Sequence, residues 1–176
     1  MKKKKYIRLV IDAIFITIFV WFDQFTKDLA VEKLKNQRAF VLIKNVFELN
    51  YLENRGAAFG VFQNQKYMFL ITGVLMLLIV LYVLIKMPEG KKYYWFEAAM
   101  VLMAGGAIGN MIDRIAQNYV VDFFYFVLIN FPIFNMADVY VTVSCVILAI
   151  LILFVLKDEE LSFLSPIKRK EKQDKE

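Results

Sequence analysis

The sequence contains no histidine, one cysteine (Cys145) and three serines among its 176 residues. The shortage of His and Cys argues against a zinc site, a His-based catalytic triad and a disulfide framework. A Ser-Lys hydrolase is also unsupported, because Ser162 and Ser165 lie in the C-terminal tail and Ser144 lies in an apolar run without a lysine. We therefore expect no metal and no cofactor, and we interpret Cys145 as a small buried apolar residue.

Apolar residues make up 60% of the chain, well above the roughly 45–50% that is usual for soluble domains. The net charge of +5 comes from basic residues clustered towards the chain ends, without an accompanying aromatic stacking motif, so we expect no nucleic acid partner. The length suits a single compact unit. These features indicate a membrane protein of one domain.

Four apolar stretches, at about 6–22, 67–85, 93–112 and 139–156, predict an α-helical membrane protein with four transmembrane helices. Each stretch is long enough to cross a hydrocarbon core of about 30 Å. The first resembles a signal peptide but lacks a small-x-small cleavage site, so we interpret it as a retained helix. It contains Arg8 and Asp12, which are one helical turn apart and are expected to pair with each other.

The distribution of Lys and Arg predicts the orientation of this bundle. Basic residues precede the first span, lie between the second and third, and follow the fourth. By the positive-inside rule these segments face the cytoplasm, so both termini are predicted to be cytoplasmic. Residues 1–157 then form one membrane-embedded domain, and 158–176 form a solvated basic tail. The unusual polar residues all fall at the outer end of the bundle.

The link after the first span carries a strand pattern within an outer β-rich insert at about 40–62. Phe47, Leu49 and Tyr51 alternate with polar residues, which is typical of a strand. Gly56 and Gly60 indicate a sharp or closely approached segment after it. We expect a small sheet on the outer face of the membrane, serving either as a platform for a peptide strand or as a structural cap.

Two aspartates stand out as candidate catalytic groups. Asp122 and Asp138 are embedded in apolar sequence and have no basic neighbour within several residues, whereas Asp113 adjoins Arg114 and is expected to pair with it. Two carboxyl groups held close together share one proton, and such a pair can hydrolyse a peptide bond. This requires the chain to turn, around "INFPIFN", so that the two acids face each other.

Small and amide side chains are spaced to support these acids. Gly105 and Gly109 form a small-xxx-small pair that allows a second helix to approach closely. Asn110 precedes Asp113 by three residues, and Asn135 precedes Asp138 by the same interval. An Asn one helical turn from a carboxylate can hydrogen-bond it or bind a substrate carbonyl.

Three other interpretations fit parts of this pattern. The acids could simply face water at the membrane interface. They could bind protons or cations in a transporter, although four short spans without an internal repeat argue against this. The protein could also be a non-catalytic scaffold, in which case replacing the acids would leave every activity unchanged.

Five segments, in order and with matching spacing, resemble type II signal peptidase, the lipoprotein signal peptidase of bacteria. They are "FDQFTK" (22–27), "NRGAAFG" (54–60), "GGAIGNMIDR" (105–114), "VVDF" (120–123) and "FPIFNMAD" (131–138). The resemblance implies an aspartic peptidase of the bacterial plasma (inner) membrane that cleaves before the diacylglyceryl-cysteine of prolipoproteins. It also implies four transmembrane helices, a small extracytoplasmic β-cradle and a short extracytoplasmic helix, with the active site at the extracytoplasmic face.

The resemblance also assigns residues. It places the catalytic pair on Asp122 and Asp138 and supporting roles on Asp23, Asn54, Gly56, Asn110, Asp113, Arg114 and Asn135. The implied partners are lipid-modified precursors and membrane lipid, and a single chain is expected to suffice as a monomer. One departure is Val139, where the family commonly has Ser, so a hydroxyl that could support Asp138 is missing.

Overall fold

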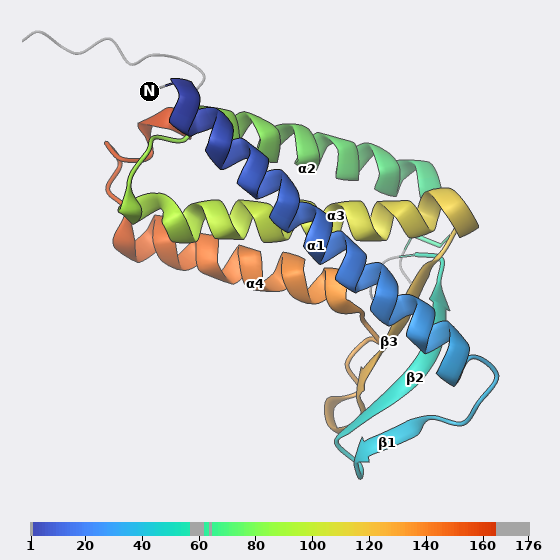
Figure 1. The fold of residues 1–176 in the computed structure, drawn as a ribbon. Coiled ribbons are helices and arrows are strands. Elements are labelled where there is room, and N and C mark those ends of the chain that lie inside the picture. The colour runs from blue at the N-terminus through green and yellow to red at the C-terminus, as the bar shows by residue number, and fades with distance from the viewer. Residues whose placement is uncertain (1, 57–61, 64, 165–176) are drawn as a thin grey trace, which may run out of the picture.

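The computed structural model describes residues 2–56, 62–63 and 65–164, and within them it contains four long helices and one antiparallel sheet (Figure 1). The helices are α1 (Lys2–Leu34), α2 (Lys66–Lys86), α3 (Tyr94–Gln117) and α4 (Met136–Ile150), and the strands are β1 (Phe40–Ile43), β2 (Phe47–Asn54) and β3 (Val120–Phe126). Single 3-10 turns cover Lys91–Tyr93, Val127–Ile129 and Ser162–Leu164, and a π-helical turn, Leu151–Val155, extends α4. Gly60 and the end of the predicted tail, 165–176, lie outside the described residues.

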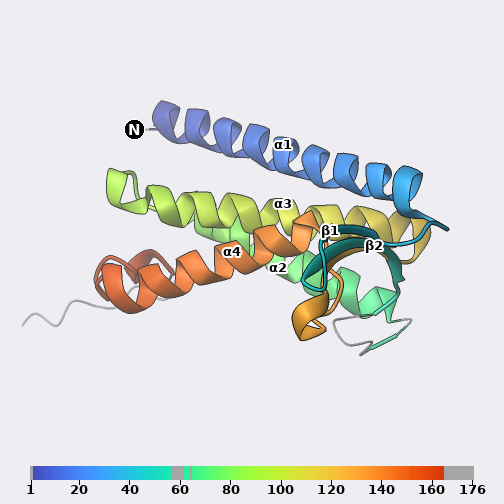
Figure 2. The same cartoon turned by 90° about the horizontal axis from the view of Figure 1, so that it is seen from below.

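Helix α3 lies in the middle of the bundle, with α2 and α4 on either side and α1 crossing it (Figures 1 and 2). Among the described residues, three helical segments are long and apolar enough to cross a membrane: Lys66–Lys86, Lys91–Gln117 and Met136–Val155. They coincide with three of the predicted spans, and a span at 6–22 within α1 stays a prediction. Many of their outward apolar side chains are exposed, as expected of helices surrounded by lipid.

Glycines allow α3 to contact two neighbouring helices closely. A Cβ atom at Gly105 would lie 2.9 Å from Cβ of Phe19 on α1, and one at Gly109 would overlap the carboxylate of Asp23. The predicted small-xxx-small pair therefore faces α1. Gly106 faces α4 instead, where a Cβ atom would lie 2.5 Å from the carbonyl oxygen of Ala137. Because α3 packs closely against both α1 and α4, polar groups of these three helices lie at the same height along the bundle.

The sheet lies beside the bundle where α1 and α3 end and α4 begins (Figure 1). Its strand order is β1-β2-β3, and the alternation predicted around Phe47, Leu49 and Tyr51 is confirmed as β2. The third strand comes from the link between α3 and α4, where the sequence analysis predicted no strand. Leu52 on β2 pairs with Asp122 on β3, so one of the candidate acids is part of the sheet.

A small cluster of buried apolar side chains packs the sheet against α1. Val121 and Phe123 on β3 are buried with Ala30 and Leu34 of α1. Because strand side chains alternate between faces, this packing directs Asp122 to the opposite face from Val121 and Phe123. The predicted turn before α4 is also confirmed, since Phe134 returns to bond with Phe124 through both backbone groups at 2.8 and 3.0 Å.

Three details differ from the sequence-based expectations. Arg8 forms an ion pair with Glu97 at 3.6 Å rather than with Asp12, and it donates to carbonyl oxygens at the C-terminal end of α2, where a cation is favoured. Cys145 is exposed on α4 rather than buried. The short helix expected between the last two spans is a single turn, Val127–Ile129.

Candidate active site

Asp122 lies on β3 and Asp138 lies in the first turn of α4, and one residue, Asn135, contacts both carboxylates. Asn135 donates from its amide nitrogen to Oδ1 of Asp122 at 2.6 Å. Its backbone nitrogen donates to Oδ2 of Asp138 at 3.1 Å, while its amide oxygen accepts from the backbone nitrogen of Asp138 at 3.0 Å. This reciprocal arrangement is a capping box, so Asn135 begins α4 and holds Asp138 in its first turn.

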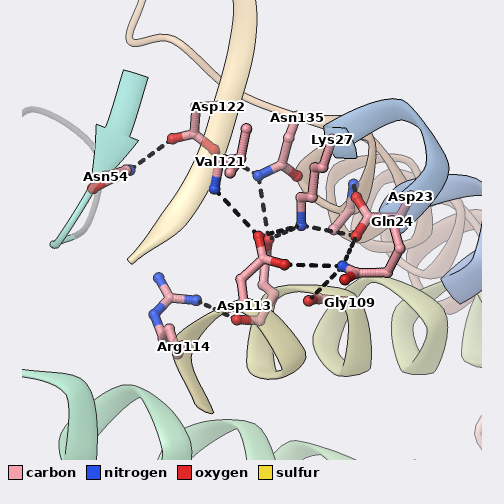
Figure 3. Close-up of polar contacts among 12 residues, drawn as sticks. Asp23, Gln24, Lys27, Asn54, Gly109, Asp113, Arg114, Val121, Asp122 and Asn135 are labelled. Atoms are coloured by element: carbon pink, nitrogen blue, oxygen red, sulfur yellow. Dashed lines mark hydrogen bonds and ion pairs between the residues drawn. The ribbon is translucent and has the colours of Figure 1, made fainter. Parts of the chain in front are cut away.

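Asp122 is almost completely enclosed, with 1% of its surface exposed. Its second oxygen accepts a hydrogen bond from the amide of Asn54 on β2 at 2.8 Å (Figure 3). Burial, followed by the nearby charge of Asp138, raises the pKa of Asp122 to about 7, although hydrogen bonds from Asn54 and Asn135 and the charge of Lys27 oppose this rise. Near neutral pH a large fraction of Asp122 therefore carries a proton.

Asp138 is half-buried and lies at the N-terminus of α4, where negative charge is favoured. Asn110 on α3 donates to its Oδ1 at 2.8 Å. The spacing on α3 suggested Asp113 as the carboxylate partner of Asn110, whereas the observed partner, Asp138, belongs to α4. Both oxygens of Asp138 thus have donors from Asn110 and Asn135. The absence of Ser at position 139 leaves neither oxygen without a partner.

Asn54 and Gly56 form a tight turn beside the pair. The backbone nitrogen of Gly56 donates to the amide oxygen of Asn54 at 2.9 Å, which directs the amide nitrogen of Asn54 towards Asp122. Arg114 donates to the carbonyl oxygen of Gly56 at 3.4 Å and to that of Asn110 at 3.2 Å, and it stacks on Phe69 at 4.4 Å. Arg114 therefore connects the turn that follows β2 to α3 rather than pairing with Asp113.

The predicted Asp113–Arg114 pair is wrong, because Asp113 pairs with Lys27 of α1 at 3.0 Å. Lys27 also contacts Asp23 at 2.8 Å, and Gln24 donates to both acids (Figure 3). The sequence analysis did not identify Lys27 or Gln24 as site residues. The spacing of Asp23 and Lys27, four residues apart on one helix, was the available signal.

All nine residues proposed from the sequence therefore lie in one connected region, where the sheet meets the bundle. The region adjoins a groove of about 520 Å³ that includes Asn54 and is otherwise lined by Asn50, Leu52, Glu53, Gln63, Tyr125, Asn130, Phe131, Pro132 and Ile133. Within the part of the chain described, no three acidic or Cys side chains are grouped so that they could hold a metal ion. Two carboxyl groups are thus held by amide donors, and one of those donors, Asn54, also lines the groove.

Comparison with known proteins gives a consistent result. The family model described as signal peptidase (SPase) II matches residues 15–154. The chain is 46% identical over 144 residues to the lipoprotein signal peptidase of Caldanaerobacter subterraneus subsp. tengcongensis, covering 81% of this chain and 96% of that protein. It is 42% identical over 139 residues to the lipoprotein signal peptidase of Streptococcus thermophilus, covering 79% and 89%.

Two solved structures, each described as a bacterial membrane enzyme, have a similar fold. One superimposes with a TM-score of 0.70 at 26% identity and covers 90% of this chain and 94% of its own. The other has a TM-score of 0.70 at 29% identity and covers 82% and 94%.

Proposed function

The chain belongs to the signal peptidase II family and removes the signal peptide from prolipoproteins, and from this premise we propose that Asp122 and Asp138 are its catalytic pair. The observation that carries the proposal is the bridge formed by Asn135, which contacts one carboxylate through its side chain and the other through its backbone. A residue that contacts both carboxyl groups is suited to holding them in the arrangement in which two acids share one proton.

The roles of the two acids follow from their surroundings. Asp122 is the more enclosed group and, with a pKa of about 7, is the better proton donor. Asp138 is half-buried at a helix N-terminus and is the better base. Asp138 takes a proton from water as the water oxygen attacks the scissile carbonyl carbon, while Asp122 gives its proton to the carbonyl oxygen.

The second half of the reaction reverses both transfers. Asp138 passes its proton to the amide nitrogen as the carbon–nitrogen bond breaks, and Asp122 recovers a proton from a hydroxyl of the tetrahedral intermediate. The products are the carboxylic acid of the signal peptide and the free amine of the lipid-modified cysteine. The pair returns to its starting protonation state without a metal or a cofactor.

The proposed substrate position follows from two features of the molecule, the apolar helices and the groove that includes Asn54. The diacylglyceryl chains stay in the bilayer along the apolar helices, so the scissile bond lies at the interface. The polypeptide lies as an extended peptide in the groove lined by Asn50 and Asn54 of β2 and Tyr125 of β3, alongside the sheet. The groups that compose the pair and its supports come from a single chain, which supports a monomeric enzyme.

The proposed membrane arrangement adds α1 as a fourth span to the three apolar segments. The basic residues of Lys2–Lys5, Lys91 and Lys92 lie at the end of the bundle opposite the candidate pair (Figure 1). By the positive-inside rule that end is cytoplasmic, together with both termini and the tail at 158–176. The pair then lies at the extracytoplasmic face of the plasma membrane, at the edge of a single peptidase domain of residues 1–157.

A precursor with and without its lipid tests this function directly. Purified protein in lipid bilayers is expected to cleave a diacylglyceryl-modified prolipoprotein before the modified cysteine and to leave the unmodified precursor uncut, because in the proposed binding mode the lipid chains hold the scissile bond beside the pair. Mass spectrometry of the products gives the cleavage position, and a chelator serves as a control that is expected to leave the rate unchanged. Equal cleavage of both precursors would contradict the proposed substrate position.

The raised pKa of Asp122 predicts the pH dependence of cleavage. Below about pH 7 Asp122 keeps the proton that the carbonyl oxygen needs, and above it the proton is lost, so kcat/KM is expected to fall about tenfold per pH unit on the basic side. Because the hydrogen bond from Asn54 lowers this pKa, Asn54→Ser is expected to move the midpoint to higher pH. Rates measured from pH 5 to 9 that stay constant would contradict the assignment of Asp122 as the acid.

A further inference from the structure

Lys27 lies at the centre of the polar cluster between α1 and α3, with 2% of its surface exposed (Figure 3). Its ammonium group is within 3.0 Å of three acceptors: Oδ2 of Asp23, Oδ2 of Asp113 and the amide oxygen of Asn110. An ammonium group has three donors, so each N–H of Lys27 has one partner. Because this nitrogen is buried, Lys27 can influence the site through its contacts with protein groups, without touching the substrate.

The two acids that Lys27 joins hold the backbone next to the catalytic pair. Asp113 accepts from the backbone nitrogen of Val121 at 3.2 Å, and Val121 immediately precedes Asp122. Asp23 accepts from the backbone nitrogen of Ala137 at 2.9 Å, and Ala137 immediately precedes Asp138. A single ammonium group thus connects the anchor of β3 to the anchor of α4.

The third contact of Lys27 fixes the side chain that supports Asp138. Because the amide oxygen of Asn110 accepts from Lys27, its amide nitrogen is turned towards Asp138, to which it donates at 2.8 Å. The same oxygen also accepts from Asn135 at 3.2 Å, and Asn135 donates to Asp122. Lys27 therefore reaches both carboxyl groups through side-chain amides as well as through the backbone.

We propose that Lys27 is a positioning residue for the catalytic pair, setting the separation of Asp122 and Asp138 through Asp23, Asp113 and Asn110. This inference rests on the proposed role of the pair. A residue that only balanced the negative charges of Asp23 and Asp113 would not need to contact Asn110. A residue that positions the pair would contact it, because Asn110 supports Asp138. The two acids come from a sheet and a helix that are linked directly by Asn135, and Lys27 adds a second link from a third element, α1.

The test compares turnover per folded molecule in variants of Lys27. Lys27→Met is expected to lower kcat by about 10²-fold, the loss associated with an error of about 1 Å in a catalytic group. KM is expected to change less than about threefold, because Lys27 contacts no substrate. Lys27→Arg, which keeps the charge and several donors, is expected to recover at least about a tenth of the wild-type kcat. Lys33→Met, at an exposed position on the same helix, is the matched control.

A second variant separates positioning from folding. Lys27→Met leaves Asp23 and Asp113 without their cation, so the double variant Lys27→Met/Asp113→Asn restores the original net charge of the cluster while keeping an acceptor for Val121. The folded double variant is expected to show the same large loss of kcat. Near-wild-type kcat in either folded variant would overturn the inference. If Asp122→Asn is inactive while folded Lys27→Met is fully active, only the role of Lys27 fails; an active Asp122→Asn refutes the pair itself.

Discussion

Asp122→Asn and Asp138→Asn are each expected to lower kcat/KM for a lipid-modified precursor by about 10⁴-fold or more, as for members of a catalytic unit in other proteases. Asn at 122 cannot give a proton to the carbonyl oxygen with comparable ease, and Asn at 138 cannot accept one from water. The double variant is expected to be no worse than either single variant, because losing one member already disables the pair. Cleavage followed by gel shift or mass spectrometry over long times measures the residual rate.

Two controls make this result interpretable. Asp28→Asn changes an exposed acid on α1 at the same end of the bundle and is expected to retain wild-type turnover. Thermal unfolding of each variant in the same lipid establishes that the proteins compared are folded. Substantial cleavage by either single variant would refute the paired mechanism, and additive losses in the double variant would indicate that the acids act independently.

Asn135→Ala is expected to cause the next largest loss, about 10²–10³-fold in kcat, in the range found when one preorganised hydrogen-bond donor is removed from an active site. The substitution removes the donor to Asp122 and the amide oxygen that caps α4. Loss of the cap is expected to reduce the free energy of unfolding by about 1 kcal/mol. Steady-state kinetics and thermal unfolding measure the two effects separately.

Asn135→Ser distinguishes the two roles of this side chain. Ser is a good N-cap, so the stability of α4 is expected to be largely restored, but its hydroxyl is too short to replace the contact of the amide with Asp122. Activity should therefore stay low although stability returns. Recovery of activity in parallel with stability would mean that Asn135 serves only to begin the helix.

The long apolar helices could be predicted from sequence because they depend on local composition, and the same local composition is what singles out Asp122 and Asp138 as candidates. Strand β3 could not, since "VVDFFYF" is a short apolar run, which does not distinguish a strand from part of a helix. Its place in the sheet depends on pairing with β2, far away in the sequence. The sequence therefore identified Asp122 as a candidate without revealing the element that positions it.

The partners of charged residues were the least predictable feature. Adjacent residues on a helix point in different directions, so Asp113 and Arg114 face different neighbours despite their proximity in sequence. Asp113 instead meets Lys27, a contact that depends on how α1 packs against α3. The i,i+4 spacing of Asp23 and Lys27 was visible, but its link to Asn110 requires the tertiary structure.

The candidate centre draws on five separate stretches of the chain, α1, β2, α3, β3 and α4, of which α4 is synthesised last. Asp138 and Asn135 arrive only with that last stretch, so a nascent chain that has emerged as far as β3 carries one acid and no bridge. The proposed mechanism therefore predicts that a chain ending at β3 has no proteolytic activity and that activity requires α4.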